Sequence, residues 1–131
     1  MDKILLVCPD VAMKDELTFF LQHSGFQVAP ATETGEAVDE IARTSPDLIV
    51  LRENGRRLNG DELCIRMREL SAAPIIVLGE EEEEAGGVEF LEMGADAYLT
   101  SPLNARELLA RIRSLLRRTH PPSLNQENIQ V

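Results

Sequence analysis

The chain has 131 residues, enough for one domain and too few for a second of ordinary size. Its hydrophobic content of 44% exceeds its charged content of 27%, which excludes a disordered polymer and predicts a buried core. No apolar stretch reaches the roughly 18 residues of a membrane span. No signal-peptide pattern precedes the first apolar run, so we expect a cytoplasmic protein without a membrane partner. The net charge of −10 repels phosphate backbones and makes nucleic acid a poor ligand for this chain.

Five short apolar runs predict the strands of the fold. They cover residues 4–7, 27–29, 48–51, 75–78 and 97–99. The first, third and fourth runs are apolar without alternation, as in strands that helices cover on both faces. The second and fifth runs are weaker, and we expect them toward the edges of the sheet.

Segments with helical periodicity lie between and after these runs. The start and stop signals are Asp10 and Gly25 for the first helix, Pro46 after the second, Asn59 with Glu62 for the third, and Asn104 with Glu107 for the fifth. The fourth helix, near residues 85–93, has the weakest signal because it contains two glycines. The side chains expected to face inward are Met13, Leu17, Phe20 and Leu21, then Ala37, Val38, Ile41 and Ala42, then Leu63, Met67 and Leu70, and finally Leu108, Leu109, Ile112, Leu115 and Leu116.

Alternating strands and helices predict an α/β domain with a doubly wound parallel sheet over residues 1–118. In such sheets the functional crevice lies beyond the carboxyl ends of the strands, so a site is expected there. The two cysteines, Cys8 and Cys64, have no metal-ligand spacing and are expected to be buried thiols. Residues 119–131 are polar with two prolines, which indicates a linker or tail that leads to a DNA-binding domain outside this chain.

In their order and spacing, several segments resemble bacterial response-regulator receiver domains. These segments are residues 4–7, 46–51, 59–60, 74–78, 94–96 and 98–99, followed by Pro102. The similarity covers residues 1 to about 118, and the arginine-rich stretch over residues 107–118 is similar to the OmpR/PhoB subfamily. The resemblance implies the flavodoxin/CheY-like (βα)5 fold, in which five helices surround five strands in the order 2-1-3-4-5.

The same resemblance implies a phosphorylation site at the strand ends, and this sequence departs from it at every position. Cys8 and Pro9 replace the two acids that hold Mg²⁺; a thiol is a soft ligand and proline has none. Arg52 replaces the aspartate that accepts the phosphoryl group, Gly79 replaces the hydroxyl residue, and Ser101 replaces the lysine. Because phosphoryl transfer depends on placed charge and metal, we expect no metal, no cofactor and no enzymatic activity.

Two nearby carboxylates leave alternatives open. Asp10 and Glu53 lie next to the replaced positions, but Asp10 is expected to cap a helix, and the side chain of Glu53 should point away from that of Arg52. Arg52 either pairs with one of these acids and locks the domain in one state, or extends into solvent, where such a pair contributes about 0–1 kcal/mol. Tyr98 occupies the aromatic switch position, and we expect it to keep one rotamer because Gly79 offers no hydroxyl.

The subfamily resemblance also implies a two-fold dimer through the fourth helix, fifth strand and fifth helix. The residues expected on this face are Val88, Leu91, Glu92, Asp96, Glu107, Leu109, Arg111, Arg113 and Arg118. The alternative is a solvated surface laced with local ion pairs. The expected partner is a second copy or another regulatory protein, with DNA contacted only through a domain outside this chain.

Together these features predict an atypical, phosphorylation-independent receiver domain of a two-component-type response regulator. It would act by dimerisation or protein–protein contact to regulate transcription. The alternative is a small-ligand sensor that uses the altered crevice around Arg52, because a guanidinium suits an anionic ligand.

Overall fold

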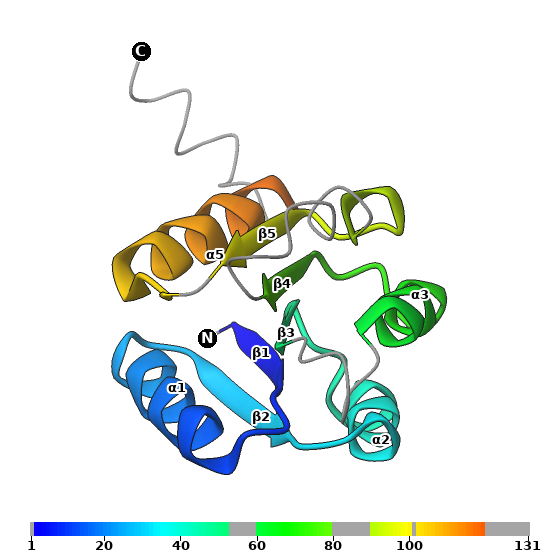
Figure 1. Ribbon diagram of the computed structural model, residues 1–131, viewed down its shortest axis with the longest axis horizontal. Coiled ribbons are helices and arrows are strands. Elements are labelled where there is room, and N and C mark those ends of the chain that lie inside the picture. The colour runs from blue at the N-terminus through cyan, green and yellow to red at the C-terminus, as the bar shows by residue number, and fades with distance from the viewer. Residues whose placement is uncertain (1, 53–59, 80–89, 101, 120–131) are drawn as a thin grey trace, which may run out of the picture.

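A five-stranded parallel sheet forms the centre of the molecule (Figure 1). The computed structural model describes residues 2–52, 60–79, 90–100 and 102–119. The strands are β1 (Lys3–Val7), β2 (Gln27–Ala31), β3 (Leu48–Arg52), β4 (Ile75–Gly79) and β5 (Ala97–Thr100). Their order is β2-β1-β3-β4-β5, and every neighbouring pair is parallel. The predicted strand order and the edge positions of the second and fifth strands are confirmed.

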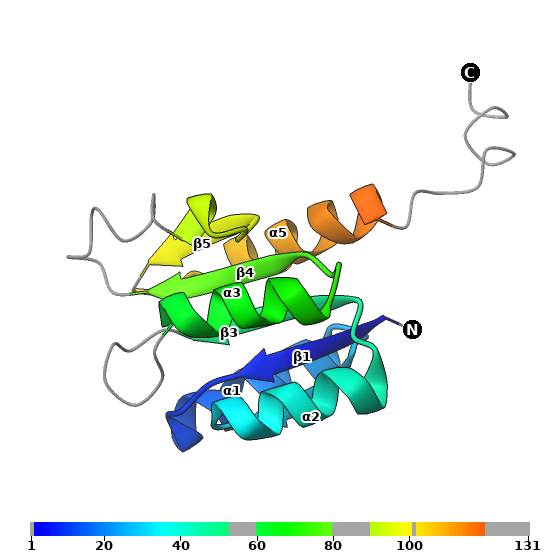
Figure 2. The ribbon, with the colours of Figure 1, turned by 90° about the vertical axis from the view of Figure 1, so that its right-hand side faces the viewer.

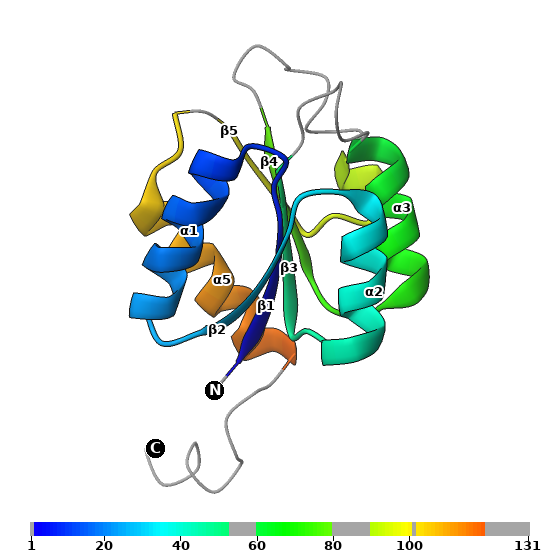
Figure 3. The same cartoon turned by 90° about the horizontal axis from the view of Figure 1, so that it is seen from below.

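Helices cover both faces of the sheet, with α1 and α5 on one face and α2 and α3 on the other (Figure 3). Their bounds are α1 (Val11–His23), α2 (Thr34–Thr44), α3 (Gly60–Leu70) and α5 (Ala105–Thr119). The predicted fourth helix reaches the described part of the chain at residues 90–92, which are helical. The doubly wound arrangement predicted from the alternating pattern is therefore confirmed.

Alternate residues of the central strands supply two separate cores. On β1, Ile4 and Leu6 pack toward α1 and α5, whereas Leu5 and Val7 pack toward α2 and α3, and all four are fully buried. This two-sided burial is the reason for the unbroken apolar runs in the sequence. It also fixes the direction of each side chain at the strand ends, since neighbouring residues on a strand point to opposite faces.

The predicted helix caps of α1 and α5 form as expected. Asp10 accepts a hydrogen bond from the Met13 backbone N–H at 3.2 Å, and Gly25 adopts a φ of 100° just after the end of α1. Asn104 Oδ1 accepts from the backbone N–H groups of Arg106 and Glu107 at 2.9 and 3.1 Å. The predicted box of Asn59 with Glu62 lies outside the described residues.

Two of the predicted inward-facing side chains are exposed. Leu70 is 46% exposed, because it belongs to the last turn of α3 and lies beside a pocket instead of over the sheet. Ala42 is exposed as well, since it follows the buried Ile41 and is rotated by about 100° away from the sheet. Those two predictions were wrong.

The amino ends of the strands are held by aspartates that each precede a strand. Asp47 Oδ2 accepts from the Lys3 backbone N–H and Asp96 Oδ2 from the Ile75 backbone N–H, both at 2.8 Å. Each carboxylate therefore ties its own strand to the first residue of the neighbouring strand. These bonds fix the relative positions of β1 with β3 and of β4 with β5 at their starting points.

Arg68 joins the end of α3 to the loops on either side of β4. Its guanidinium donates to the backbone carbonyls of Gly94 at 3.0 Å, Ser71 at 3.1 Å, and Ala73. It also lies 3.5 Å from the Asp96 carboxylate. These contacts hold the segment that leads into β5 against α3.

The outer edge of β2 carries Pro30, which pairs in register with Leu6 of β1 and is exposed. Proline has no backbone N–H and is found in sheets mainly at such edges. The sequence of β2 is thus compatible with an edge position and not with a central one.

Candidate functional site

The positions at which this sequence departs from the receiver pattern lie at the carboxyl ends of the strands, as the topology requires. All neighbouring strands are parallel, and Figure 2 shows the ends of β1, β3, β4 and β5 at one edge. Cys8 follows β1, Arg52 ends β3 and Gly79 ends β4. Ser101 follows β5 but lies outside the described residues, so its prediction stays a prediction.

Cys8 and Pro9 form a closed, apolar corner of this edge. Both residues are buried, and Cys8 has no exposed surface. The Cys8 backbone N–H donates to Ala31 O at 2.8 Å, and its thiol donates weakly to Asp10 O at 3.5 Å. Burial raises the pKa of the Cys8 thiol, while the hydrogen bond to the Asp10 backbone and the nearby Arg52 charge act in the opposite direction. At neutral pH the thiol is protonated and is a poor ligand for a hard cation.

The half-buried Arg52 side chain turns toward the neighbouring strand. Its Nη1 donates to the Leu78 carbonyl of β4 at 3.3 Å. Asp10 is exposed and its carboxylate caps α1, and among the described residues it makes no ion pair with Arg52. The Asp10 carboxylate instead accepts the capping hydrogen bond of α1, and the predicted lock of Arg52 stays a prediction. Glu53, the other predicted partner, lies outside the described residues.

Tyr98 fills the space that a side chain at position 79 would need. A Cβ built on Gly79 would lie 2.9 Å from Tyr98 Cε1 and closer still to its Cζ and Oη. The Tyr98 ring stacks on Phe90, with centroids 5.6 Å apart and an interplanar angle of 19°. Phe90 is itself 4% exposed and belongs to the core on the α2 and α3 side. The aromatic ring is thus enclosed between Phe90 and the bare backbone at the end of β4.

The predicted dimer residues are mostly exposed but do not all share one side of α5. Leu91, Glu92, Glu107, Arg111 and Arg118 are exposed, and Val88 lies outside the described residues.

Three members of that set are placed differently from the rest. Leu109 is half-buried against the core. The Asp96 carboxylate is bonded to the Ile75 N–H and lies 3.5 Å from Arg68. Arg113 lines a pocket with Ser24 and belongs to the flank of α5 that faces α1.

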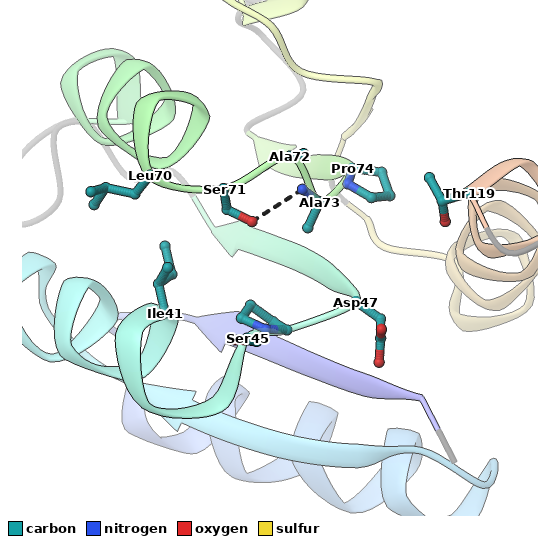
Figure 4. Close-up of a pocket in the computed structure, with 10 residues that line it drawn as sticks. Ile41, Ser45, Asp47, Leu70, Ser71, Ala72, Ala73, Pro74 and Thr119 are labelled. Carbon is teal, nitrogen blue, oxygen red and sulfur yellow. Dashed lines mark hydrogen bonds between the residues drawn. The ribbon is translucent and has the colours of Figure 1, made fainter.

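A pocket of about 520 Å³ lies at the opposite end of the sheet from the replaced residues. Figure 4 shows it between the last turns of α2 and α3, with Ile41 and Leu70 facing each other and Thr119 at the end of α5. Asp47 and Pro74, which precede β3 and β4, complete its wall. Sequence reasoning missed this pocket because its lining residues carry no catalytic pattern. The crevice around Arg52, where a ligand was predicted, stays a prediction, because residues 53–59 after β3 and residues 80–89 after β4 lie outside the described part.

The described part of the chain contains no group of three or more His, Cys, Asp or Glu side chains arranged to hold a metal ion. The substituted positions that the structure describes at the carboxyl edge are Cys8, Pro9, Arg52 and Gly79. None of these four side chains is an oxygen ligand of the kind that Mg²⁺ prefers.

Comparison with known proteins agrees with this geometry. Residues 4–113 match the model of the family described as the response regulator receiver domain. The chain therefore belongs to the response regulator receiver domain family.

The chain is similar to several longer proteins. The response regulator MprA of Mycobacterium leprae is 41% identical over 120 residues, which is 91% of this chain and 53% of MprA. The sensory transduction protein RegX3 of Mycobacterium tuberculosis is 36% identical over 118 residues, which is 90% of this chain and 52% of RegX3. The CpxR homolog of Haemophilus influenzae is 37% identical over 131 residues, all of this chain and 57% of that protein. This chain thus spans about half the length of these relatives.

Solved structures show the same fold. A two-component response regulator from Clostridium difficile aligns with a TM-score of 0.85 at 30% identity, covering 92% of this chain and 99% of the other. Among the described helices, none combines the length and the apolar character needed to cross a bilayer.

Proposed function

We propose that this chain is a cytoplasmic, phosphorylation-independent receiver domain that passes signals by protein–protein contact. The observation that carries the proposal is Arg52 at the end of β3, where the family's phosphate acceptor stands. A guanidinium stays protonated at physiological pH and cannot form an acyl phosphate. In this protein Arg52 is also engaged with the Leu78 carbonyl of the next strand.

The enclosed Tyr98 supports the same proposal. In a phosphorylation-driven domain the aromatic residue responds to a hydroxyl at the end of β4. Here Gly79 has no hydroxyl, and the volume of the missing side chain is taken by the Tyr98 ring. Moving the ring outward would give up its stacking on Phe90 and leave a void, at a cost of order 1–3 kcal/mol. The ring position is therefore set by packing and does not depend on a phosphoryl group.

Mass spectrometry of the intact protein tests phosphorylation independence directly. The protein is incubated with acetyl phosphate or phosphoramidate and Mg²⁺, alongside a phosphorylatable receiver domain as the positive control. We expect the control to gain a phosphoryl group and this chain to keep its mass. A phosphoryl adduct on this chain would overturn the proposal.

We propose that the output is homodimerisation or contact with another regulatory protein on the side of α5 that carries Glu107, Arg111 and Arg118. The exposed Leu91 and Glu92 fit the same surface, since the resemblance places the fourth helix beside α5 in the dimer. The names of the relatives, which include a transcriptional regulatory protein, support a role in transcription through a DNA-binding domain outside this chain.

Sedimentation velocity tests the dimer surface. Arg111→Glu with Arg118→Glu should shift a dimer to the monomer, because two cations are replaced by anions at the contact. Arg66→Glu, an equally exposed change on α3, is the matched control and should leave the dimer intact. A wild-type chain that is monomeric at all concentrations, or a dimer that the double variant keeps, would contradict this surface.

The small-ligand alternative around Arg52 stays a prediction. A thermal-shift screen of anionic metabolites tests it, because a ligand that binds only the native state raises the melting temperature. A stabilising ligand whose effect disappears in Arg52→Gln would favour the sensor over the contact-only domain.

A further inference from the structure

Helix α5 concentrates positive charge on an acidic protein. The chain has 13 cationic and 23 acidic residues, yet α5 holds five arginines and a single glutamate. All five arginines, Arg106, Arg111, Arg113, Arg117 and Arg118, are exposed. None of them forms an ion pair or a side-chain hydrogen bond with any residue that the structure describes. These cations are therefore available to a partner.

The arginines form two stripes on opposite flanks of the helix. At about 100° per residue, Arg113 and Arg117 lie within roughly 40° of each other, and Arg111 and Arg118 within roughly 20°. The two pairs are more than about 90° apart, on either side of the solvent-facing surface. The buried face opposite is made by Leu108, Ile112, Leu115 and Leu116. Only the Arg111 and Arg118 flank belongs to the proposed dimer surface.

The Arg113 and Arg117 flank borders a small pocket next to the end of α1. The pocket has a volume of about 330 Å³ and is lined by Asp2, Ser24, Phe26, Arg113, Leu116 and Arg117. The two apolar residues belong to the core, with Phe26 9% and Leu116 6% exposed. The pocket thus combines an apolar floor with two guanidinium groups that have no partner among the residues that the structure describes. Its lining residues Asp2, just before β1, and Arg117, near the end of α5, place it near the amino ends of the strands. Figure 3 shows the start of β1 close to the end of α5.

Asp2 also lines this pocket. With two arginines and one aspartate, the lining carries a net charge of one positive unit. Its backbone carbonyl accepts from the Gln27 N–H at 2.9 Å, so its position is fixed by the pairing of β1 with β2. A carboxylate here repels an anion that approaches along β1. An incoming acidic group is therefore directed toward the α5 side of the pocket.

We propose that this pocket docks an acidic segment of a partner protein. One apolar side chain of the segment contacts Phe26 and Leu116, and its carboxylates pair with Arg113 and Arg117. The planar guanidinium groups match carboxylates in a two-point geometry. The volume lies at the small end of ligand pockets and suits one or two side chains. A nucleic acid fits less well, because the net charge of −10 repels a long polyanion.

Fluorescence anisotropy with a defined probe tests the proposal on the full chain. The probe is a labelled peptide of glutamates around one central leucine, and a second peptide has serine in place of the leucine. We expect saturable binding of the first peptide and at least severalfold weaker binding of the second. Absence of saturable binding would overturn the proposal, as would equal binding of the two peptides, since the apolar floor would then play no part.

Charge-reversal variants on the same helix provide the matched comparison. Arg113→Glu and Arg117→Glu should each weaken peptide binding about tenfold, whereas Arg111→Glu and Arg118→Glu should change it less than about twofold. Asp2→Asn should strengthen binding by about two- to fivefold, because it removes the opposing carboxylate.

Equal losses of peptide affinity on both flanks of α5 would overturn a defined site, because they indicate general charge attraction. A labelled single-stranded oligonucleotide that binds as tightly as the peptide would equally overturn the assignment to an acidic polypeptide.

Discussion

The two ends of the sheet have opposite characters. At the amino ends, Asp47 and Asp96 each hold the first residue of a neighbouring strand at 2.8 Å, and Arg68 bridges three loop carbonyls. At the carboxyl ends, the Cys8 thiol is buried, and Arg52 donates a hydrogen bond to a strand carbonyl. One end carries polar side chains that stabilise the fold, while the other carries a buried thiol and a guanidinium at positions where the resemblance to receiver domains places acids.

This contrast shows that fold and chemistry depend on different residues of the same strands. The aspartates at the amino ends are needed whether or not the domain is phosphorylated, because they satisfy backbone N–H groups where the strands begin. At the carboxyl ends, Cys8, Pro9, Arg52 and Gly79 stand at the positions where the resemblance places the reactive side chains, and the parallel sheet forms with them in place.

The largest expected effect comes from restoring the family's residues at the carboxyl end alone. In a variant carrying Cys8→Asp, Pro9→Asp, Arg52→Asp, Gly79→Thr and Ser101→Lys, we expect phosphorylation by acetyl phosphate in the presence of Mg²⁺. The physical reason is that the substitutions supply the oxygen ligands, the nucleophile and the neutralising cation together. Intact mass measurement detects the product. A folded variant that stays unmodified would show that the loops of this chain also oppose the reaction.

At the amino end, loss of a strand-start aspartate should reduce stability. Asp47→Ala and Asp96→Ala should each lower the free energy of unfolding by about 1.5–3 kcal/mol, because each leaves a backbone N–H without its charged acceptor. Urea denaturation measures the change, with the exposed Asp39→Ala as control. If the free energy of unfolding falls no more than in the control variant, the amino-end aspartates do not stabilise the fold, and the contrast between the two ends is contradicted.

A side chain at position 79 should compete with Tyr98 for the same space. Gly79→Thr should destabilise the protein by about 1–3 kcal/mol, because the ring must move or the strand end must shift. In a Tyr98→Ala background the same change should cost less, giving a coupling energy of at least about 1 kcal/mol. Tyrosine fluorescence, with Tyr98 as the sole tyrosine and no tryptophan in the chain, reports the ring directly. If the destabilisations caused by Gly79→Thr and Tyr98→Ala simply add in the double variant, Gly79 does not set the position of the Tyr98 ring.

The smallest effect concerns the buried thiol of Cys8. Burial raises its pKa above the ordinary value of 9.0, so the folded protein holds the proton more tightly than the unfolded chain. The resulting stabilisation is present in full below the unfolded pKa and is lost as pH rises through the folded pKa. We expect the stability advantage of the wild type over Cys8→Ala to shrink on the alkaline side of neutrality. A difference that is constant with pH would contradict the raised pKa.

Much of the fold could be predicted from sequence, because its signals are local. The unbroken apolar runs identified the central strands, and Asp10, Gly25 and Asn104 identified helix ends by their capping chemistry. Leu70 and Ala42 were misplaced, since periodicity says which side of a helix a residue occupies but not where the sheet beneath it ends.

The carboxyl edge could be predicted only in part. Topology alone brings Cys8, Arg52 and Gly79 to one edge, so their grouping followed from the order of the strands. The contact between Tyr98 and Gly79, and the bond from Arg52 to Leu78, depend on side-chain rotamers that no sequence pattern specifies. The two flanks of α5 could have been separated by helical geometry, but only the pocket beside Ser24 shows which flank faces α1.

Pro30 on the outer edge of β2 limits how copies of this domain can associate. An exposed edge strand is a template for sheet extension, in which another chain adds its own strand through backbone hydrogen bonds. A residue without an N–H interrupts that template at the fourth position of a five-residue strand. Assembly by strand addition, and the fibrous aggregation that can follow from it, is thereby disfavoured on this side, which leaves the helical surfaces for recognition.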